Sequence, residues 1–168
     1  QYTPNDVYDV DATDEQVLAD IRVGGQVRKV MIQANKNGFM YVLDRTNCKL
    51  IAANPFVKVN WASRIDMATG RPVLTDISKR FAAGEEVEIW PSRGTNAVPI
   101  AFNPNKGLIY ASTWNLARIQ KLAPPKPGPP AELPLRLMRY QAPPPSTSSS
   151  TSAIRLPSQS LRREGGRA

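Results

Sequence analysis

The chain has 168 residues, of which 41% are hydrophobic, and its formal net charge is +8 with no histidine. The absence of histidine excludes imidazole catalysis and histidine–metal sites, and the single cysteine, Cys48, excludes an internal disulfide and a cysteine-cluster zinc site. No apolar stretch is long enough to span a bilayer, so no membrane span is predicted. There is no signal peptide, and because the chain opens at Gln1 we expect it to begin within a longer protein.

The basic charge is concentrated in the last part of the chain. Residues 1–121 contain six prolines and carry a net charge of +3, whereas residues 122–168 contain ten prolines and carry +5. A nucleic-acid surface usually clusters lysine and arginine on an ordered face with aromatic side chains between them. Here the arginines are scattered and Tyr140 is the only aromatic residue, so a solvated basic tail is predicted and nucleic acid is not expected as a partner.

Strand-like segments and turn residues alternate along the first part of the chain. Four runs have strand character: Val17–Val23, Val27–Ala34, Phe39–Leu43 and Leu50–Ala53. Gly24-Gly25 between the first two is a two-residue loop suited to a hairpin. The only candidate helix is the short segment Ile77–Ala83. This pattern predicts an all-β sandwich, barrel or propeller.

Two segments of the chain resemble each other weakly. Asn35–Val42 and Asn105–Ala111 both read as a turn glycine followed by an apolar strand with a central tyrosine, Tyr41 or Tyr110. These tyrosines lie 69 positions apart, which is longer than one propeller blade of about 40–50 residues. A repeat would therefore require an insertion, and the polar stretch from Asp66 to Arg93 is the expected place for it.

The composition changes abruptly at Leu122. Ala123–Pro130 is rich in proline, Ser146–Ser152 is a serine/threonine tract, and the end of the chain is basic. Such a composition predicts a disordered, low-complexity tail over residues 122–168, distinct from a domain at residues 1–121. Two origins remain open: a natural disordered tail, or an out-of-frame translation of GC-rich DNA after Lys121, which the composition slightly favours.

Five acidic side chains lie close together before the first predicted strand: Asp6, Asp9, Asp11, Asp14 and Glu15. In an extended segment the alternate residues Asp9 and Asp11 point the same way, so both carboxylates would reach one hard cation. The alternative is a solvated acidic loop, and composition alone favours that alternative.

Four blocks in order carry a resemblance to a known family: Thr3–Asp11 (TPNDVYDVD), Asn35–Ile51 (NKNGFMYVLDRTNCKLI), Pro55–Val73 (PFVKVNWASRIDMATGRPV) and Thr95–Tyr110 (TNAVPIAFNPNKGLIY). Over residues 1–121 the chain resembles the PQQ-dependent (pyrroloquinoline quinone) methanol and ethanol dehydrogenases. Members of this family fold as eight-bladed β-propellers, so the resemblance implies that the chain contains a few blades.

The resemblance implies a role for Asp9 and Asp11. Asp9 matches the catalytic base, which takes the hydroxyl proton of a primary alcohol while hydride passes to PQQ and an aldehyde forms. A bound metal ion acts there as a Lewis acid, with Asp9 beside it. Asp11 matches the second aspartate of the lanthanide-using members, so calcium or a lanthanide ion is expected, with the lanthanide favoured. The glutamate and asparagine ligands of the family would lie upstream of this chain.

Two further residues match cofactor contacts. Lys36 matches the lysine or arginine that hydrogen-bonds the quinone oxygens, where a cation would stabilise developing negative charge; without the resemblance, it reads as a turn lysine. Asn96 matches an asparagine near PQQ, although its usual tryptophan neighbour is Ala97 here. Trp61 and Trp90 are expected to pack between blades rather than to contact the cofactor.

Two positions depart from the family pattern. Cys48 stands where the family favours a turn glycine, and a cysteine at positive φ costs about 1 kcal/mol. Tyr8 replaces the tryptophan that usually precedes the catalytic aspartate, a change that preserves bulk.

The resemblance also implies partners and a compartment. A complete member passes electrons from reduced PQQ to a c-type cytochrome or haem domain in the periplasm. We expect the present chain alone to be inactive, since it carries only part of the ligand set and of the propeller. Two alternatives are a non-catalytic propeller scaffold and a pseudogene product; retention of Asp9, Asp11 and Lys36 together argues against a scaffold.

Overall fold

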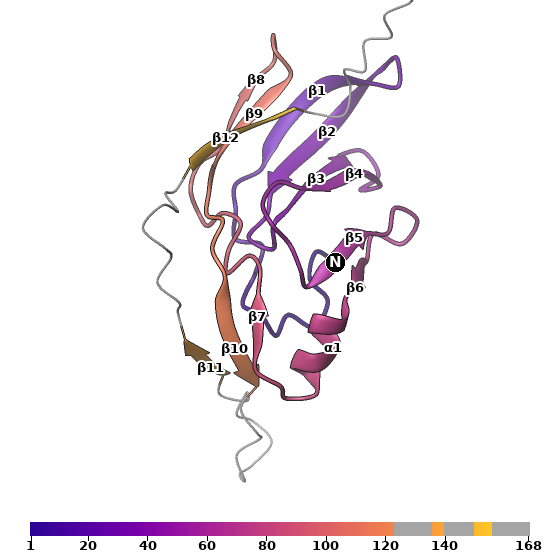
Figure 1. The fold of residues 1–168 in the computed structure, drawn as a ribbon. Helices are drawn as coiled ribbons and strands as arrows, with labels where there is room; N and C mark the ends of the chain where they lie inside the picture. Colours follow the sequence, from indigo (N-terminus) through magenta and orange to yellow (C-terminus); the bar gives the residue numbers. More distant parts are fainter. Residues whose placement is uncertain (123–135, 140–149, 156–168) are drawn as a thin grey trace, which may run out of the picture.

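The computed structural model describes residues 1–122, 136–139 and 150–155, and it is built almost entirely of antiparallel strands (Figure 1). The strands form one four-stranded sheet, two three-stranded sheets and one two-stranded sheet, and the one helix in the described ranges, α1 (Asp76–Ala82), is short. The predicted all-β class is therefore confirmed. None of the described segments forms a helix long and apolar enough to cross a membrane.

The four-stranded sheet follows the chain in order as a meander. It consists of β1 (Val17–Val23), β2 (Gln26–Ala34), β3 (Phe39–Asp44) and β4 (Leu50–Pro55), each hydrogen-bonded to the next. Val23 pairs with Gln26 across Gly24-Gly25, so the two-residue hairpin is confirmed. Both glycines have positive φ values of 59° and 83°, which glycine adopts without a side-chain clash.

The two faces of this sheet pack into two different cores. Met40 and Val42 of β3 point with Val30 and Ile32 of β2 into the first core, which also contains Ile109. Phe39 and Tyr41, the alternate residues of β3, point the other way into a second, aromatic core. Because successive side chains of a strand face opposite sides, one apolar strand serves both layers. The sheet is thus covered on both faces, and the sequence of β3 is accordingly a near-continuous apolar run.

The stretch from Asp66 to Arg93 forms part of the second core. It contains β6 (Pro72–Leu74), which pairs with β5 (Ala62–Ile65), then α1 and β7 (Val87–Ile89). Phe81 of α1 and Ile89 of β7 are both fully buried in that core. Although this stretch is polar enough to be predicted as an insertion, its apolar residues anchor it to the rest of the fold.

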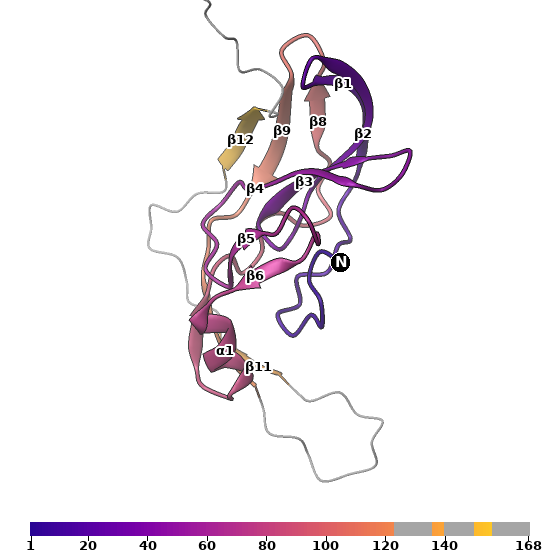
Figure 2. The same cartoon turned by 90° about the vertical axis from the view of Figure 1, so that its right-hand side faces the viewer.

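The remaining strands lie beside the first sheet. In Figures 1 and 2, the sheet formed by β8 (Ala101–Asn103), β9 (Leu108–Thr113) and β12 (Ser150–Arg155) occupies the upper half of the molecule with β1 and β2. The sheet formed by β7, β10 (Arg118–Leu122) and β11 (Arg136–Arg139) lies at the lower end near α1. Ile109 and Ala111 of β9 bring the upper sheet into the first core.

Most of the predicted tail lies outside the described residues, and the division at residue 121 stays a prediction. Two short segments of it are described: β11 pairs with β10, and β12 pairs with β9. The composition predicts no strand here. An unpaired sheet edge presents free backbone N–H and C=O groups, and it can be paired by any extended segment, whatever its composition.

Candidate functional site

Lys36 lies in the tight turn that joins β2 to β3. Asn35 N–H donates to Phe39 O at 3.0 Å and Gly38 N–H donates to Asn35 O at 2.9 Å, closing the turn. The side-chain Oδ1 of Asn35 also accepts from Asn37 N–H at 3.0 Å. Asn35 and Asn37 are fully buried, whereas the Lys36 side chain between them retains 13% exposure. The turn therefore holds a largely buried lysine side chain within a hydrogen-bonded loop.

Two of the predicted site residues meet this ammonium. Lys36 Nζ lies 2.7 Å from Asp11 Oδ1 and 3.6 Å from Asp9 Oδ1. The aspartate side chains are about half exposed, at 50% for Asp11 and 52% for Asp9. The structure thus brings together Asp9, Asp11 and Lys36 from segments 25 residues or more apart in sequence, with the carboxylates open to solvent.

The loop that carries the two aspartates is shaped by Asp6. Its Oδ1 accepts from Tyr8 N–H and its Oδ2 from Val10 N–H, both at 2.9 Å. Asp9 lies between these two anchored residues and has a φ of 59°. In an extended segment, Asp9 and Asp11 would point the same way because they are alternate residues. The left-handed conformation of Asp9 interrupts that extended geometry. The two carboxylates instead meet at the Lys36 ammonium.

The ion pair changes the acidity of Asp11. The hydrogen bond from the Lys36 ammonium, reinforced by its positive charge, lowers the pKa of the Asp11 carboxyl below its usual value despite some desolvation. Asp11 is therefore held in its charged form, as an oxygen ligand or an acceptor of hydrogen bonds.

Asp14 is a part of the site that sequence reasoning missed. Its Oδ2 accepts the backbone N–H of Lys36 at 2.9 Å, and its backbone O accepts from Gln33 Nε2 at 2.9 Å. Asp14 is only 7% exposed, and burial raises the pKa of its carboxyl although the Lys36 N–H and charge lower it. Its Oδ1 is buried without a hydrogen-bond partner among the described residues. In sequence, Asp14 is indistinguishable from the other acidic residues of the loop, since its burial depends on the docking of the β2–β3 turn.

Asn96 belongs to a loop that touches the Lys36 turn through its backbone. Gly94 N–H donates to Lys36 O at 2.7 Å, and Gly94 O accepts from Trp114 N–H at 3.0 Å. A Cβ atom at Gly94 would lie 2.8 Å from Gly38 Cα and 3.1 Å from Asn35 O, so only glycine permits this approach. Asn96 itself is half-buried, and its carbonyl accepts from Val98 N–H.

Buried aromatic side chains pack around Tyr8 of the aspartate loop. Tyr8 is 5% exposed; its ring stacks on Phe81 with centroids 5.3 Å apart and lies tilted against Trp61 at 5.7 Å. Trp61 is buried and donates from Nε1 to Asn37 O at 2.9 Å, which ties this cluster to the Lys36 turn. Trp61 is therefore a packing residue of the second core, and its place between blades stays a prediction. Trp90 is half-buried instead, and Lys58 Nζ lies 4.0 Å from its ring centroid.

The oxygen donors at this site suit a hard cation. Asp9 and Asp11 offer carboxylate oxygens, the ligand type that calcium and similar ions prefer, and a cationic group already contacts both of them. Within residues 1–122 and the two short tail strands, no group of three or more acidic or cysteine side chains is placed to hold a metal ion. The chain therefore contributes two candidate ligands, and a full coordination sphere needs oxygens from elsewhere.

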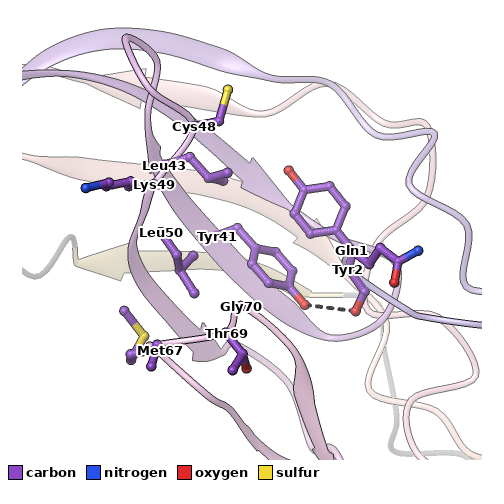
Figure 3. Close-up of a pocket in the computed structure, with 11 residues that line it drawn as sticks. Gln1, Tyr2, Tyr41, Leu43, Cys48, Lys49, Leu50, Met67, Thr69 and Gly70 are labelled. Carbon is purple, nitrogen blue, oxygen red and sulfur yellow. Dashed lines mark hydrogen bonds between the residues drawn. The ribbon is translucent and has the colours of Figure 1, made fainter.

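A separate cavity of about 500 Å³ lies between the β3–β4 hairpin and the turn around Gly70 (Figure 3). Tyr2 and Tyr41 form one wall with ring centroids 4.4 Å apart, and Tyr41 Oη donates to Tyr2 O at 3.4 Å. Burial raises the pKa of the Tyr41 phenol, so it stays neutral as a donor. None of the predicted site residues lines this cavity.

The first part of the chain matches a family model. The model for the glucose/ethanol/alcohol dehydrogenase β-propeller domain of PQQ enzymes covers residues 1–61, which include Asp9, Asp11 and Lys36. This range ends at Trp61 and contains the complete four-stranded sheet.

Curated proteins match a longer stretch of the chain. The quinohemoprotein alcohol dehydrogenase ADH IIB of Pseudomonas putida is 48% identical over 112 residues, which is 66% of this chain and 16% of that protein. The lanthanide-dependent methanol dehydrogenase of Methylacidiphilum fumariolicum is 40% identical over 119 residues, 69% of this chain and 19% of that protein. The chain thus spans less than a quarter of the length of these relatives.

Solved structures share the fold over a similar range. The quinohemoprotein alcohol dehydrogenase ADHIIG of Pseudomonas putida HK5 superposes with a TM-score of 0.72 and 34% identity over 76% of this chain and 19% of that chain. A europium-containing methanol dehydrogenase gives 0.69 and 38% identity over 73% of this chain and 22% of that one. The sheets described above are accordingly a part of such a β-propeller.

Proposed function

The chain contains part of the β-propeller of the PQQ-dependent alcohol dehydrogenase family, and from this premise we propose that it supplies one side of an alcohol-oxidising site. The observation that carries the proposal is the contact of Lys36 with both Asp9 and Asp11 at the end of the first sheet. A non-catalytic propeller scaffold has no need to keep two half-exposed carboxylates beside one lysine.

Asp9 is the proposed proton acceptor. Its carboxylate is 52% exposed and held on a loop anchored by Asp6 on either side, so an alcohol hydroxyl can reach it. A positioned carboxylate that removes the hydroxyl proton contributes a rate factor of about 10²–10⁴. The substrate class proposed on this basis is a primary alcohol, and the product is the aldehyde.

Lys36 and Asp11 provide the electrostatic partners of that step. The Lys36 ammonium donates a hydrogen bond and positive charge toward the place where negative charge develops. Asp11 offers a second anionic oxygen beside Asp9, a donor set suited to calcium and, because of its added charge, to a lanthanide ion. PQQ, when bound, supplies the acceptor for the hydride of the alcohol, and the metal ion supplies a Lewis acid. Asn96 is proposed as a further cofactor contact, on the loop that Gly94 fastens to Lys36.

The partners and compartment proposed here follow from the relatives. Several relatives are named quinohemoproteins and one is a cytochrome c-linked 1-butanol dehydrogenase of Thauera butanivorans, 41% identical over 123 residues. We therefore propose a c-type cytochrome or haem domain as electron acceptor and the periplasm as the compartment. We expect the chain alone to be inactive, because it spans less than a quarter of the length of these relatives and offers only Asp9 and Asp11 as candidate metal ligands.

The proposal is tested by a chimaera. Residues 1–121 would replace the matching segment of ADH IIB, and alcohol oxidation would be measured with PQQ and added calcium or a lanthanide. We expect the chimaera to be active, Asp9→Asn to lower kcat by a factor of about 10² or more, and Asp20→Asn, an equally exposed carboxylate paired with Arg45, to have no effect.

Two results would argue against the proposal. Equal activity of the chimaera and its Asp9→Asn variant would show that Asp9 is not the base. Turnover by the purified 168-residue chain with PQQ and metal would contradict the expectation that the chain alone is inactive.

A further inference from the structure

The second half of β9 is held in its sheet by β12, a strand that lies beyond the family-like part of the chain (Figures 1 and 2). β8 pairs with β9 at residues 108–110, whereas β12 pairs along the whole strand, with Ser150 opposite Thr113 and Arg155 opposite Leu108. Among the described strands, residues 111–113 therefore have no ladder partner except β12. Without β12, this sheet would be a pair of strands with an open edge, and two-stranded sheets are only marginally stable.

One side chain of β12 adds a specific contact to this backbone pairing. Ile154 lies opposite Ile109, and directly opposed residues of an antiparallel pair present their side chains on the same face. Ile109 is fully buried in the first core, and Ile154 packs against that core. The preceding residue, Ala153, faces the other way and is exposed. Ile154 is therefore the side chain by which the first core can select an added strand.

We propose that the outer edge of β9 is a strand-accepting site, and that residues 150–155 of this chain occupy it as an internal ligand. An open edge offers a row of unpaired N–H and C=O groups, and an extended peptide added there gains main-chain hydrogen bonds while its side chains give selectivity. The ligand that fits is an extended peptide with an aliphatic residue opposite Ile109. A strand tethered in the same chain acts at a high effective concentration, so β12 keeps the strands of other molecules away from this edge.

The end of β9 that depends on β12 is also connected to the Lys36 turn. Trp114 follows Thr113 directly, and its N–H donates to Gly94 O at 3.0 Å. Gly94 N–H in turn donates to Lys36 O at 2.7 Å. Occupation of the β9 edge thus holds the strand end at which these bonds begin. Loss of β12 should loosen Trp114 more than Leu108, because Leu108 is also paired with β8.

Amide hydrogen exchange of the full 168-residue chain, resolved by residue with NMR, tests the inference. In the wild type we expect the amides of residues 111–113 that point to β12 to be protected, at every protein concentration, because the strand comes from the same chain. Ile154→Asp places a charge against the first core and should detach β12, which raises exchange of these amides at least about tenfold. Ala153→Asp carries the same charge on the exposed side and is the matched control, expected to stay within about twofold of the wild type.

A peptide added in trans separates loss of the strand from general unfolding. A synthetic peptide with the sequence of residues 150–155, added in excess to the Ile154→Asp chain, should restore protection at residues 111–113. The same peptide with aspartate in place of Ile154 should not. Exchange in β2 and β3 should be equal in all samples, since these strands pair with each other and not with β12.

Several results would overturn the inference. Exchange of residues 111–113 in the wild type at the rate of an unstructured peptide would show that the edge is not occupied, and equal effects of Ile154→Asp and Ala153→Asp would show that Ile154 is not the anchor. Protection that rises with protein concentration would assign the strand to a second copy of the chain. If Ile154→Asp also exposes β2 and β3, Ile154→Ala takes its place, and failure of the peptide to restore protection there would reject the accepting site.

Discussion

Asp14 Oδ2 accepts the backbone N–H of Lys36 at 2.9 Å, across 22 residues of sequence. This contact connects the loop of Asp9 and Asp11 to the turn that carries their counter-charge. It uses a carboxylate that is almost completely buried, and burial of such a group raises its pKa. The position of the lysine in the site therefore depends on an acid that does not itself face the solvent.

Asp14→Asn is expected to stabilise the chain increasingly as the pH rises. The folded pKa of Asp14 lies above its unfolded value of 3.8, so the folded state binds the extra proton, and wild-type stability falls as the pH rises from that value through the folded pKa. Asparagine keeps an oxygen acceptor for Lys36 N–H and removes the buried charge. Urea unfolding at pH 3.5 and pH 7 measures the difference between variant and wild type. A difference that is the same at both pH values, or that favours the wild type at pH 7, would contradict the prediction.

Asp11→Asn is expected to show the opposite pH dependence. The folded pKa of Asp11 is lowered by Lys36, so its contribution to stability is present above the unfolded value of 3.8 and is lost as the pH falls through the folded pKa. The variant should be slightly less stable than the wild type at pH 7 and equal to it in strong acid. Because the pair is half exposed, 0.5 M salt should reduce the difference at pH 7. A difference insensitive to both pH and salt would indicate that packing, not charge, is responsible.

Cys48→Gly is expected to stabilise the chain by about 1 kcal/mol. Cys48 has a φ of 59°, in the region that glycine occupies without a side-chain clash, and its thiol is exposed. The predicted positive φ at this position is thus confirmed. Cys48→Ala retains a Cβ atom and is the matched control, expected to stay within about 0.5 kcal/mol of the wild type. Equal midpoints of glycine and alanine variants in chemical denaturation would mean that the turn carries no strain.

Trp61→Ala is expected to destabilise the chain by about 3–5 kcal/mol, since its fully buried ring contacts Tyr8 and Phe39 in the second core. Trp61→Phe keeps most of the ring but removes the donor to Asn37 O, and about 1–2 kcal/mol should be lost. Trp90→Phe is the control at a half-buried ring and should cost less than either. Similar losses at Trp61 and Trp90 in thermal unfolding would refute the central role of Trp61.

The meander and its turns were readable from the sequence because local chemistry determines them. Runs of strand-favouring residues predict β1–β4, and Gly24-Gly25 predicts the first hairpin. The position of Lys36 beside Asp9 and Asp11 was available only from the family resemblance, because no local pattern reports a contact across 25 residues.

Other features depend on tertiary packing and have no sequence signal. Asp14 looks like its acidic neighbours until the β2–β3 turn buries it, and the left-handed Asp9 departs from the extended geometry that alternation assumes. Gly94 carries no turn signature, yet its lack of a Cβ permits the approach to Gly38. The pairing of β11 and β12 arises from open sheet edges rather than from the composition of those segments.

The clamp on the Lys36 backbone also determines how fast the site can respond. Rotation of a side chain about its own bonds takes picoseconds to nanoseconds, whereas displacement of a loop takes nanoseconds to microseconds or longer. Because Asp14 and Gly94 fix the main chain on both sides of Lys36, its ammonium moves on the faster of these timescales. A change in the position of this ammonium therefore requires no rearrangement of the main chain.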